Sequence, residues 1–464
     1  MLNAADNTLL TRTGPGTPLG DYFRRFWQPV ALSCEIAEAD SPPVRVKVLG
    51  EELLAFRDTR GRVGLIEPKC AHRGADLFFG RNEDGGIRCI YHGWKYDVAG
   101  RCVEMPNVPV GSPYFRIHKA EGTDNRDSAD SAGNAGGQAC GASGPAATTI
   151  AIKAYPTREF GDMVWAYLGP REHMPSEIAQ LECGTVPASH RYVTKRLQQC
   201  NWAQSMEGAL DTAHFSFLHM PAPTLAKNDT MTAAADESRI RWLRNDPLPQ
   251  FAILDHDVGF VIGGSRRADG DELYWRITQF MLPAHSITPS AMPGETLYGY
   301  TWVPIDDESC WIYVYAWHPE RALPDDERAR YAKGGFGQFA ELGPGYVPLR
   351  NRGNDYLIDR EQQKHRSFTG VRGIAEQDAM AQDSQGLILD RTREHLSPTD
   401  VGVVRFRRVM LDGAKALLDG NEPAAAQRHH AYNVRAGGAM AHSGVPFEDV
   451  MRNRFGSVSG RPTP

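Results

Sequence analysis

Two short segments of this 464-residue chain place cysteine and histidine side chains at spacings that suit metal binding. The segment CAHRG carries Cys70 and His72, and the segment CIYHG carries Cys89 and His92. Two thiolates and two imidazoles are ligands for a structural zinc ion or for a Rieske [2Fe–2S] cluster. Zinc sites tend to take both cysteines from one knuckle and both histidines from another, whereas each loop here supplies one of each. The spacing therefore favours the cluster, with both thiolates on one iron and both imidazoles on the other.

A third segment, NWAQSMEGALDTAHFSFLHM over residues 201–220, combines two carboxylates and two imidazoles with apolar and aromatic neighbours. In a continuous helix Glu207, Asp211 and His214 share one face, because they lie at positions i, i+4 and i+7. His219 joins that face only if the helix bulges or ends between the two histidines. A lone buried histidine is more often a satisfied core residue, but four polar groups in one apolar segment favour a mononuclear iron site.

These constellations closely resemble the motifs of the Rieske non-haem iron aromatic-ring-hydroxylating oxygenases, in their alpha (oxygenase) subunit. The resemblance lies in the loops CAHRGADL and CIYHGWKYD and in the complete pattern Glu-x3-Asp-x2-His-x4-His. It implies that His214 and His219 bind the mononuclear iron. It also implies that Asp211 is a catalytic partner that links an iron histidine to a cluster histidine through hydrogen bonds. Glu207 is expected to support this catalytic site from behind.

The resemblance also implies a distant carboxylate as the third iron ligand. The family takes this ligand from the aspartate of a Glu/Gln–Asp pair that is followed, a few residues later, by another acid. The segment EQDAMAQDS matches that pattern, with Asp378 as the expected ligand and Asp383 as the later acid. Asp383 and Glu376 are the other candidates in the segment.

Composition and charge exclude several classes of partner. The formal net charge of −6 gives no reason to expect nucleic acid or an anionic membrane. No apolar run approaches the length of a membrane span, and the N-terminal residues lack the basic and then apolar pattern of a secretion signal. Eight cysteines in 464 residues are too few for a disulfide scaffold. We therefore expect a cytoplasmic protein with neither nucleic acid nor membrane as a partner.

The pattern of the chain predicts an α+β protein with two main domains. Residues 1–40 are a lead-in, and residues 41–170 form an all-β Rieske [2Fe–2S] domain of short strands separated by turns. Inside it, residues 121–149 are rich in Gly, Ala, Ser and Asp, which predicts a flexible surface insertion. Residues 171–464 form the mononuclear iron domain, α+β with an antiparallel sheet of the helix-grip (START-like) kind that the resemblance implies.

The last long helix is signalled at both ends. Ser397 begins the segment SPTD as the N-cap, and Gly420 provides the stop. The apolar positions expected to face the core are Val404, Leu411, Ala414 and Leu418.

Stretches along nearly the whole chain resemble the phthalate 4,5-dioxygenase branch of the family. This implies cis-dihydroxylation of a phthalate-like aromatic carboxylate, and the alternative is oxidative O-demethylation of a methoxylated aromatic acid by a monooxygenase. An anionic substrate requires a cation in the pocket. The candidates are the strand-borne arginines Arg266, Arg267 and Arg276.

The expected partners are O2, the aromatic acid and a separate NAD(P)H-dependent reductase of the flavin or ferredoxin type. A reductase is needed because the glycine runs of this chain do not follow a strand and open a helix, as a dinucleotide fold requires. The resemblance implies head-to-tail homotrimers, which can stack in pairs as hexamers, with the cluster of one subunit facing the iron of the next. Two alternatives of other classes stay open: a Rieske electron-transfer protein without oxygenase activity, and a regulator with structural zinc.

Overall fold

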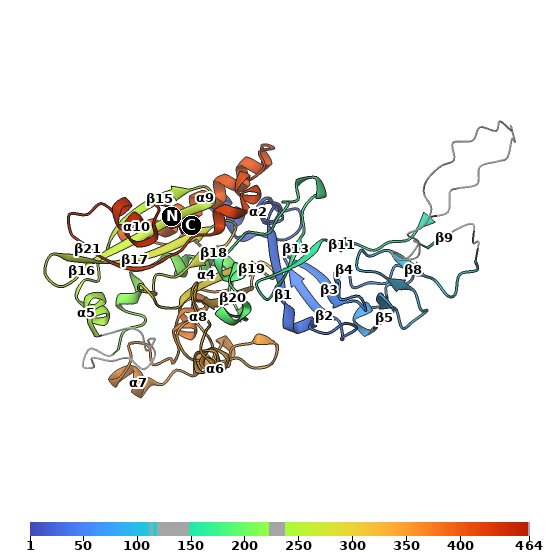
Figure 1. Ribbon diagram of the computed structural model, residues 1–464, viewed down its shortest axis with the longest axis horizontal. Coiled ribbons are helices and arrows are strands. Elements are labelled where there is room, and N and C mark those ends of the chain that lie inside the picture. The colour runs from blue at the N-terminus through green and yellow to red at the C-terminus, as the bar shows by residue number, and fades with distance from the viewer. Residues whose placement is uncertain (111, 113–114, 118–147, 222–236, 463–464) are drawn as a thin grey trace. The chain divides into compact units, whose positions relative to one another are not determined.

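The computed structural model describes residues 1–110, 112, 115–117, 148–221 and 237–462. The chain divides into two compact units (Figure 1). The small unit comprises Ser33–Val46 and Glu52–Arg158, and the large unit comprises Met1–Leu32, Lys47–Glu51 and Glu159–Pro464. The insertion predicted at residues 121–149 lies outside the described residues except for Thr148–Thr149, which form strand β10 beside β9 (Phe115–Arg116).

The small unit is built from short strands, as the sequence predicts. Four strands form one sheet in the order β11-β4-β3-β2: Ala154–Tyr155, Val63–Ile66, Glu51–Arg57 and Val44–Val48. Four more form an antiparallel sheet in the order β5-β6-β7-β8: Arg81–Glu83, Gly86–Arg88, Lys95–Tyr96 and Cys102–Glu104. Buried side chains from both sheets, among them Leu54, Phe56, Ile87 and Tyr96, form one core. Valine, isoleucine and aromatic residues in these runs favour strands because they pack well on a pleated surface.

The boundary predicted at residue 170 does not coincide with the division between the units. Strand β13 (Met163–Tyr167) was expected to close the first domain, but it belongs to the large unit. The reason is its antiparallel pairing with β1 (Trp27–Leu32), which lies far away in the sequence. Strand β12 (Thr157–Phe160) completes this three-stranded sheet.

The large unit contains the predicted antiparallel sheet. Seven strands follow the order β14-β20-β19-β18-β17-β16-β15, and an eighth, β21, pairs with β17. Their bounds are Arg191–Gln198, Cys310–Trp317, Leu297–Pro304, His285–Ile287, Glu272–Met281, Gly259–Arg267 and Gln250–His256, with Gly437–His442 for β21. Most positions of β17, β19 and β20 are buried, so both faces of the central strands are covered.

Ten α-helices are found in the part of the chain that the structure describes, and those labelled in Figure 1, among them α5, α8, α9 and α10, lie around the sheet of the large unit. Their bounds are Ala4–Thr11 (α1), Pro18–Phe23 (α2), Glu182–Thr185 (α3), Trp202–Leu210 (α4), Glu237–Asn245 (α5), Asp325–Lys333 (α6), Arg360–His365 (α7), Ile374–Ser384 (α8), Val401–Leu418 (α9) and Phe447–Phe455 (α10). Helix α4 contacts strand β19 as well as α8 and α9. It is therefore the helix that ties the sheet to the other two helices.

The long helix α9 confirms the predicted ends but not the predicted apolar face. Ser397 caps the 3-10 turn Pro398–Asp400, which leads directly into α9, and Gly420 has a φ of +83° just after its end. Leu411 and Ala414 are buried as expected, whereas Val404 and Leu418 are exposed. The buried face instead includes Val403, Phe406 and Met410, one position away from the predicted register at its start.

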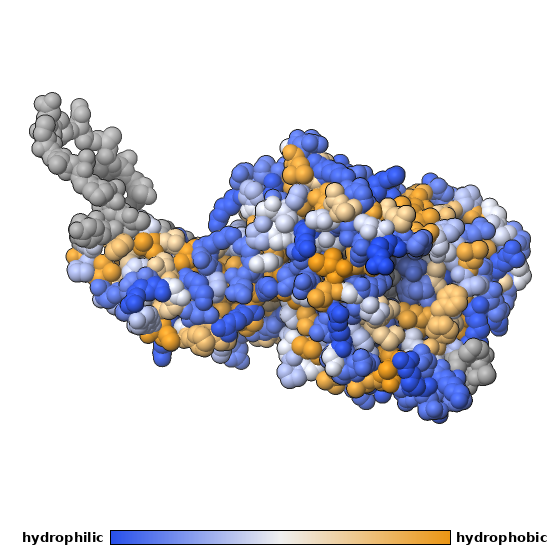
Figure 2. Space-filling view, turned by 180° about the vertical axis from the view of Figure 1, so that it is seen from behind, coloured by the Kyte–Doolittle hydropathy of each residue, from blue (hydrophilic) through white to orange (hydrophobic). Residues whose placement is uncertain are grey.

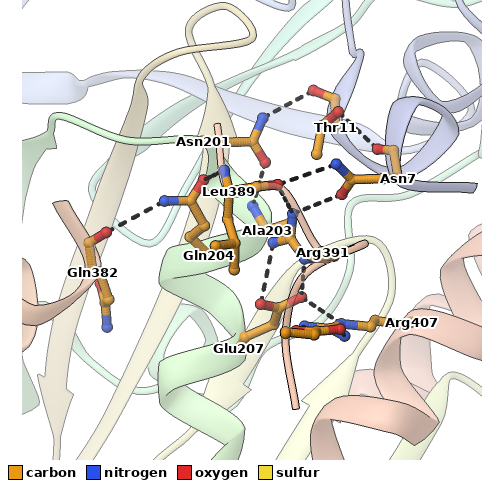
Figure 3. Close-up of polar contacts among 11 residues, drawn as sticks. Asn7, Thr11, Asn201, Ala203, Gln204, Glu207, Gln382, Leu389, Arg391 and Arg407 are labelled. Atoms are coloured by element: carbon orange, nitrogen blue, oxygen red, sulfur yellow. Dashed lines mark hydrogen bonds and ion pairs between the residues drawn. The ribbon is translucent and has the colours of Figure 1, made fainter. Parts of the chain in front are cut away.

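Buried polar side chains hold α4 in place, as Figure 3 shows. Glu207 accepts hydrogen bonds from Arg391 at 2.9 and 3.1 Å and from Arg407 of α9 at 2.8 Å. Asn201 caps the helix by accepting from the backbone N–H of Ala203, and its amide donates to the carbonyl of Thr11 at 2.9 Å. Burial alone would raise the pKa of Glu207, but the two guanidinium groups outweigh burial and lower it. The carboxylate therefore stays ionised and joins α4 to α9.

None of the described helices is long and apolar enough to span a bilayer. On the face shown in Figure 2, hydrophobic and hydrophilic residues are interspersed over the large unit. Scattered apolar residues are normal on the surface of a folded protein.

Candidate metal centres

Two histidines and one aspartate of the large unit meet around a common point. His214 Nε2 lies 3.1 Å from His219 Nε2, and Asp378 Oδ1 lies 3.7 and 3.2 Å from these two nitrogens. Metal–ligand bonds of about 2.0–2.2 Å at right angles place neighbouring ligand atoms about 3 Å apart. The donor set of two imidazoles and one carboxylate is the facial triad of non-haem iron proteins. The arrangement therefore fits a single iron ion with positions left open on its other side.

The backbone reaches this arrangement by leaving the helix earlier than expected. Helix α4 ends at Leu210, and Asp211 has an extended conformation, so the prediction that Glu207, Asp211 and His214 share one helical face is wrong. His214 begins a 3-10 turn that ends at Ser216, and Phe217 is non-helical with φ −134° and ψ −71°. The α-helix therefore ends before His214, earlier than the predicted break between His214 and His219, and only the end of the 3-10 turn falls between the two histidines.

A glutamine fixes the tautomer of His219. Gln377 Nε2 donates to the carbonyl of Val371 at 2.8 Å, so its Oε1 is the atom that faces His219 Nδ1, at 2.7 Å. That oxygen accepts only if Nδ1 carries the proton, which leaves Nε2 of His219 unprotonated toward the triad. Both Gln377 and His219 are fully buried, so the hydrogen bond is shielded from water.

The carboxylate of Asp211 orients the other histidine, His214. Its Oδ2 lies 3.4 Å from His214 Nδ1, and its Oδ1 accepts from the backbone N–H of Ala213 at 2.6 Å. Burial opposes ionisation of Asp211, but the hydrogen bond and charge of His214, together with the backbone N–H groups of Ala213 and His214, lower the pKa of the carboxyl. Burial likewise opposes a charged His214, yet Asp211 raises the pKa of the imidazole above its ordinary value. Asp211 thus orients His214, while about a quarter of its own side chain stays exposed.

The other predicted acids lie away from the triad. Asp383 accepts a hydrogen bond from Gln198 at 2.6 Å and another from the Tyr356 hydroxyl. Glu376 accepts from the backbone N–H of Glu341 at 3.0 Å, and burial raises its pKa. Glu207, placed at the site by the sequence pattern, is engaged by its two arginines instead.

A cavity adjoins the triad on the side of the sheet. Its lining includes His214, Phe215, Asp378, Arg196 of β14 and Arg276 of β17. Polar groups from other elements complete it, among them Ser205, Ser290, Tyr300 and Gln338. A second hollow, lined by Asp211 and Gln382 among others, also reaches His214 and Asp378. Reactants therefore have room on two sides of the triad.

The predicted arginines have different positions. Arg276 lines the cavity, its guanidinium stands 3.8 Å from the centre of the Phe215 ring, and its Nη2 has no hydrogen-bond partner. Arg266 is equally buried but donates to the carbonyl oxygens of Thr212 and Asp246, at 2.7 and 3.1 Å. Arg267 is exposed. The structure thus brings Arg276, and neither of its neighbours on β16, to the cavity.

In the small unit, two loops of equal geometry carry the predicted cluster residues. Cys70 N–H donates to the carbonyl of Ala75, and Cys89 N–H donates to that of Trp94 in the same way, at 2.9 and 2.8 Å. A glycine completes each loop at positive φ, Gly74 at +70° and Gly93 at +74°, where other residues are strained.

The loops bring like ligands together. The rings of His72 and His92 have centroids 4.4 Å apart, while Cys70 and Cys89 are buried free thiols. Burial, and more weakly the Cys89 charge, raise the pKa of Cys70, while the hydrogen bond to Tyr96 lowers it. The Tyr96 hydroxyl accepts from the backbone N–H of Ala71 at 3.0 Å and shares a hydrogen bond with Cys70 Sγ, 3.3 Å away.

The spacing of the four loop side chains also differs from the spacing expected around a single metal ion. Among the described residues, the only group of three or more potential ligands with atoms within 4.8 Å of one another is the triad of the large unit. A tetrahedral zinc would draw all four loop side chains within such a distance. Their separation into a pair of thiols and a pair of imidazoles fits the two irons of a cluster.

Sequence reasoning overlooked three residues of these centres. Gln377 was noticed only as the neighbour of Asp378, and Tyr96 only as part of a loop. Arg196 was missed because nothing in the strand RYVTKRLQ distinguishes it from a solvated arginine. The one available signal was the expectation that each ligand imidazole donates its other N–H to an acceptor, for which the amide of Gln377 was a candidate.

Replacing Gln377 by leucine should weaken iron binding. The variant loses the acceptor that orients His219, and loss of such a partner typically costs about 10–100-fold in metal affinity. Iron per chain, measured after dialysis against graded chelator, should fall while the visible spectrum of the [2Fe–2S] cluster is unchanged. The control is Gln427→Leu, because Gln427 is an exposed glutamine whose amide donates to the carbonyl of His173. Equal chelator resistance in both variants would contradict the assignment.

Comparison with known proteins agrees with this geometry. A model of the Rieske [2Fe-2S] domain matches residues 26–114, and a model described as LigXa C-terminal domain like matches residues 166–445. The phthalate 4,5-dioxygenase oxygenase subunit of Pseudomonas putida is 36% identical over 431 residues, 90% of this chain and 88% of the relative. The 3-chlorobenzoate-3,4-dioxygenase oxygenase subunit of Comamonas testosteroni is 31% identical over 470 residues, 97% of this chain and 98% of the relative.

A solved structure shares the fold. It is an oxygenase variant in complex with ferredoxin, from carbazole 1,9a-dioxygenase, with a TM-score of 0.55 and 18% identity over 90% of this chain and 98% of that one. The match to the Rieske domain favours a [2Fe–2S] cluster over structural zinc. The match of the second domain excludes the alternative of a Rieske protein that only transfers electrons. The chain belongs to the Rieske non-haem iron oxygenases, as the oxygenase subunit that carries a [2Fe–2S] cluster and a mononuclear iron.

Proposed function

We propose that this oxygenase subunit cis-dihydroxylates an aromatic carboxylate. The observation that carries the proposal is the guanidinium of Arg276 in the cavity beside the triad. The side chain is 4% exposed, and its hydrogen bond to the Thr212 hydroxyl, at 3.0 Å, neutralises no charge. Burial lowers the pKa of Arg276, which is the sign of a desolvated cation. A buried cation without a carboxylate partner is costly, and a substrate carboxylate would relieve that cost.

The triad, and the aromatic side chains of Phe215, Tyr300 and Trp302 that line the adjoining cavity, support oxygenation of an aromatic ring. His214, His219 and Asp378 are proposed to hold iron, which when bound supplies a place to activate O2 beside the substrate. Gln377 and Asp211 keep the two imidazoles in the tautomer that an iron ligand needs. The three protein ligands leave the cavity side free for substrate.

The cluster residues are proposed to divide between two irons. Cys70 and Cys89 would bind one iron, and His72 and His92 the other. Burial, and then the charges of His92 and Arg73, lower the pKa of His72 and so favour the neutral imidazole that a metal binds.

Asp211 is proposed to link the triad with the cluster of a neighbouring subunit in a head-to-tail trimer. Its carboxylate lies beside His214, and the residue lines both hollows that adjoin the triad. Glu207 is a positioning residue in this account, because its carboxylate is held by Arg391 and Arg407 and fixes α4. Electrons are proposed to come from an NAD(P)H-dependent reductase through a flavin or ferredoxin component, a class of partner that fits the ferredoxin complex of the structural relative.

Products formed with labelled O2 test the reaction type. The reconstituted enzyme, with a surrogate reductase, is supplied with benzoate or with methoxybenzoate under 18O2. Dihydroxylation predicts a cis-diol with both oxygen atoms labelled. Formaldehyde and a phenol, with no diol from either acid, would show O-demethylation and contradict the proposal.

Replacing Arg276 by glutamine should selectively impair acid substrates. Loss of one partner of a buried charged pair costs about 2–5 kcal/mol, so kcat/KM for benzoate should fall by about 30-fold or more. The same measurement with benzamide, which carries no charge, should change by less than about fivefold. The matched control is Arg267→Gln, because Arg267 is an exposed arginine of the adjacent strand. An equal loss for acid and amide would mean that Arg276 acts without binding a carboxylate.

A further inference from the structure

A second buried guanidinium faces the cavity that holds Arg276. Arg196 lies on β14 with 5% of its surface exposed, and it lines the cavity together with Asp378. Its Nη1 donates to Gln198 Oε1 at 2.6 Å, and its Nε is buried without a hydrogen-bond partner. Neither Arg196 nor Arg276 forms an ion pair with a carboxylate anywhere in the described ranges. Asp378 and Glu376 act on Arg196 through space without a direct ion pair. Buried charges are normally paired directly, so both guanidinium groups are left able to bind an acidic group of a ligand.

The residues behind Arg196 hold it in place without neutralising it by direct contact. Gln198 Nε2 donates to Asp383 Oδ1 at 2.6 Å, which leaves Gln198 Oε1 as the atom that faces Arg196. Asp383 also accepts from the Tyr356 hydroxyl. The side-chain amide of Gln198 thus lies between the Asp383 carboxylate and the Arg196 guanidinium. It orients the guanidinium and prevents direct contact between the two charged groups. A guanidinium fixed in this way loses little rotational freedom when it binds a ligand.

The two arginines enter the cavity from distant strands. Four spacings of about 4.8 Å, or roughly 19 Å along the sheet, separate β14 from β17, because β20, β19 and β18 lie between them. Arg196 adjoins the Asp378 side of the triad, whereas Arg276 stands over Phe215, next to His214. From this wide spacing of the two strands we expect acidic groups on adjacent ring carbons to reach both guanidinium groups less well than acidic groups further apart on the ring.

We propose that Arg196 binds a second acidic group of the substrate, so that the preferred substrate is an aromatic diacid with its acidic groups on non-adjacent ring positions. This inference rests on the proposed function, in which Arg276 binds the first acidic group. A role of Arg196 as mere counter-charge to Asp378 would affect all substrates equally. The two roles are therefore separated by comparing substrates within one enzyme.

The test compares four acids on the enzyme loaded with cluster and iron, with a surrogate reductase: benzoate and the 1,2-, 1,3- and 1,4-benzenedicarboxylates. In the wild type, kcat/KM for the 1,3- or 1,4-diacid should exceed that for benzoate and for the 1,2-isomer by about 30-fold or more. Arg196→Gln should remove most of this advantage, and Arg196→Lys should restore part of it. Arg191→Gln is the matched control, because Arg191 lies on the same strand but pairs with Asp162. It should leave the ratio of diacid to monoacid unchanged.

Three results would overturn the inference while leaving the proposed function intact. One is a wild type that oxidises benzoate as well as every diacid, and another is a preference for the 1,2-isomer. The third is an Arg196→Gln variant, with normal iron and cluster content, that loses the same factor for monoacid and diacid. If that variant does not fold, the wild-type ranking of the four acids alone decides. Failure to oxidise any aromatic acid would instead refute the proposed function itself.

Discussion

The close approach of two imidazoles and one carboxylate inside the large unit is the constraint on which the rest of the structure depends. Three polar atoms within 3.1–3.7 Å of one another, in a partly or fully buried site, are stable only if each is oriented and a cation neutralises the group. Gln377 and Asp211 provide the orientation by accepting from the outer nitrogens of the two histidines. Iron bound at these three residues, as we propose, would supply the positive charge.

The fold meets this constraint with rigid elements rather than with the ligand segment itself. Helix α8 presents Asp378 and Gln377 from adjacent positions, so one helix supplies both a proposed iron ligand and the hydrogen-bond partner of His219, another proposed ligand. Helix α4 is held by the ionised Glu207 between Arg391 and Arg407, and it ends just before the ligand segment. The two histidines can then turn toward α8, because the backbone between them is non-helical.

Much of this arrangement could be predicted from the sequence, because local patterns carried it. The cluster loops, the histidine spacing and most strands follow from ligand chemistry and from period-two alternation. The helix end before Asp211 could not be foreseen, since no proline closely follows it and the one nearby glycine, Gly208, lies inside the helix. The same holds for the membership of β13 in the large unit, which depends on its pairing with a strand more than 130 residues away. Arg196 was invisible for a related reason, because its burial arises from the curved sheet and not from its neighbours in the chain.

The central claim is that His214, His219 and Asp378 form an iron site separate from the cluster. The most direct measurement is iron content together with the EPR signal of the reduced cluster, in the wild type and in His219→Ala. The account predicts about three irons per wild-type chain and about two in the variant, with the cluster signal unchanged. Three irons in the variant, or a loss of the cluster signal together with the third iron, would contradict it.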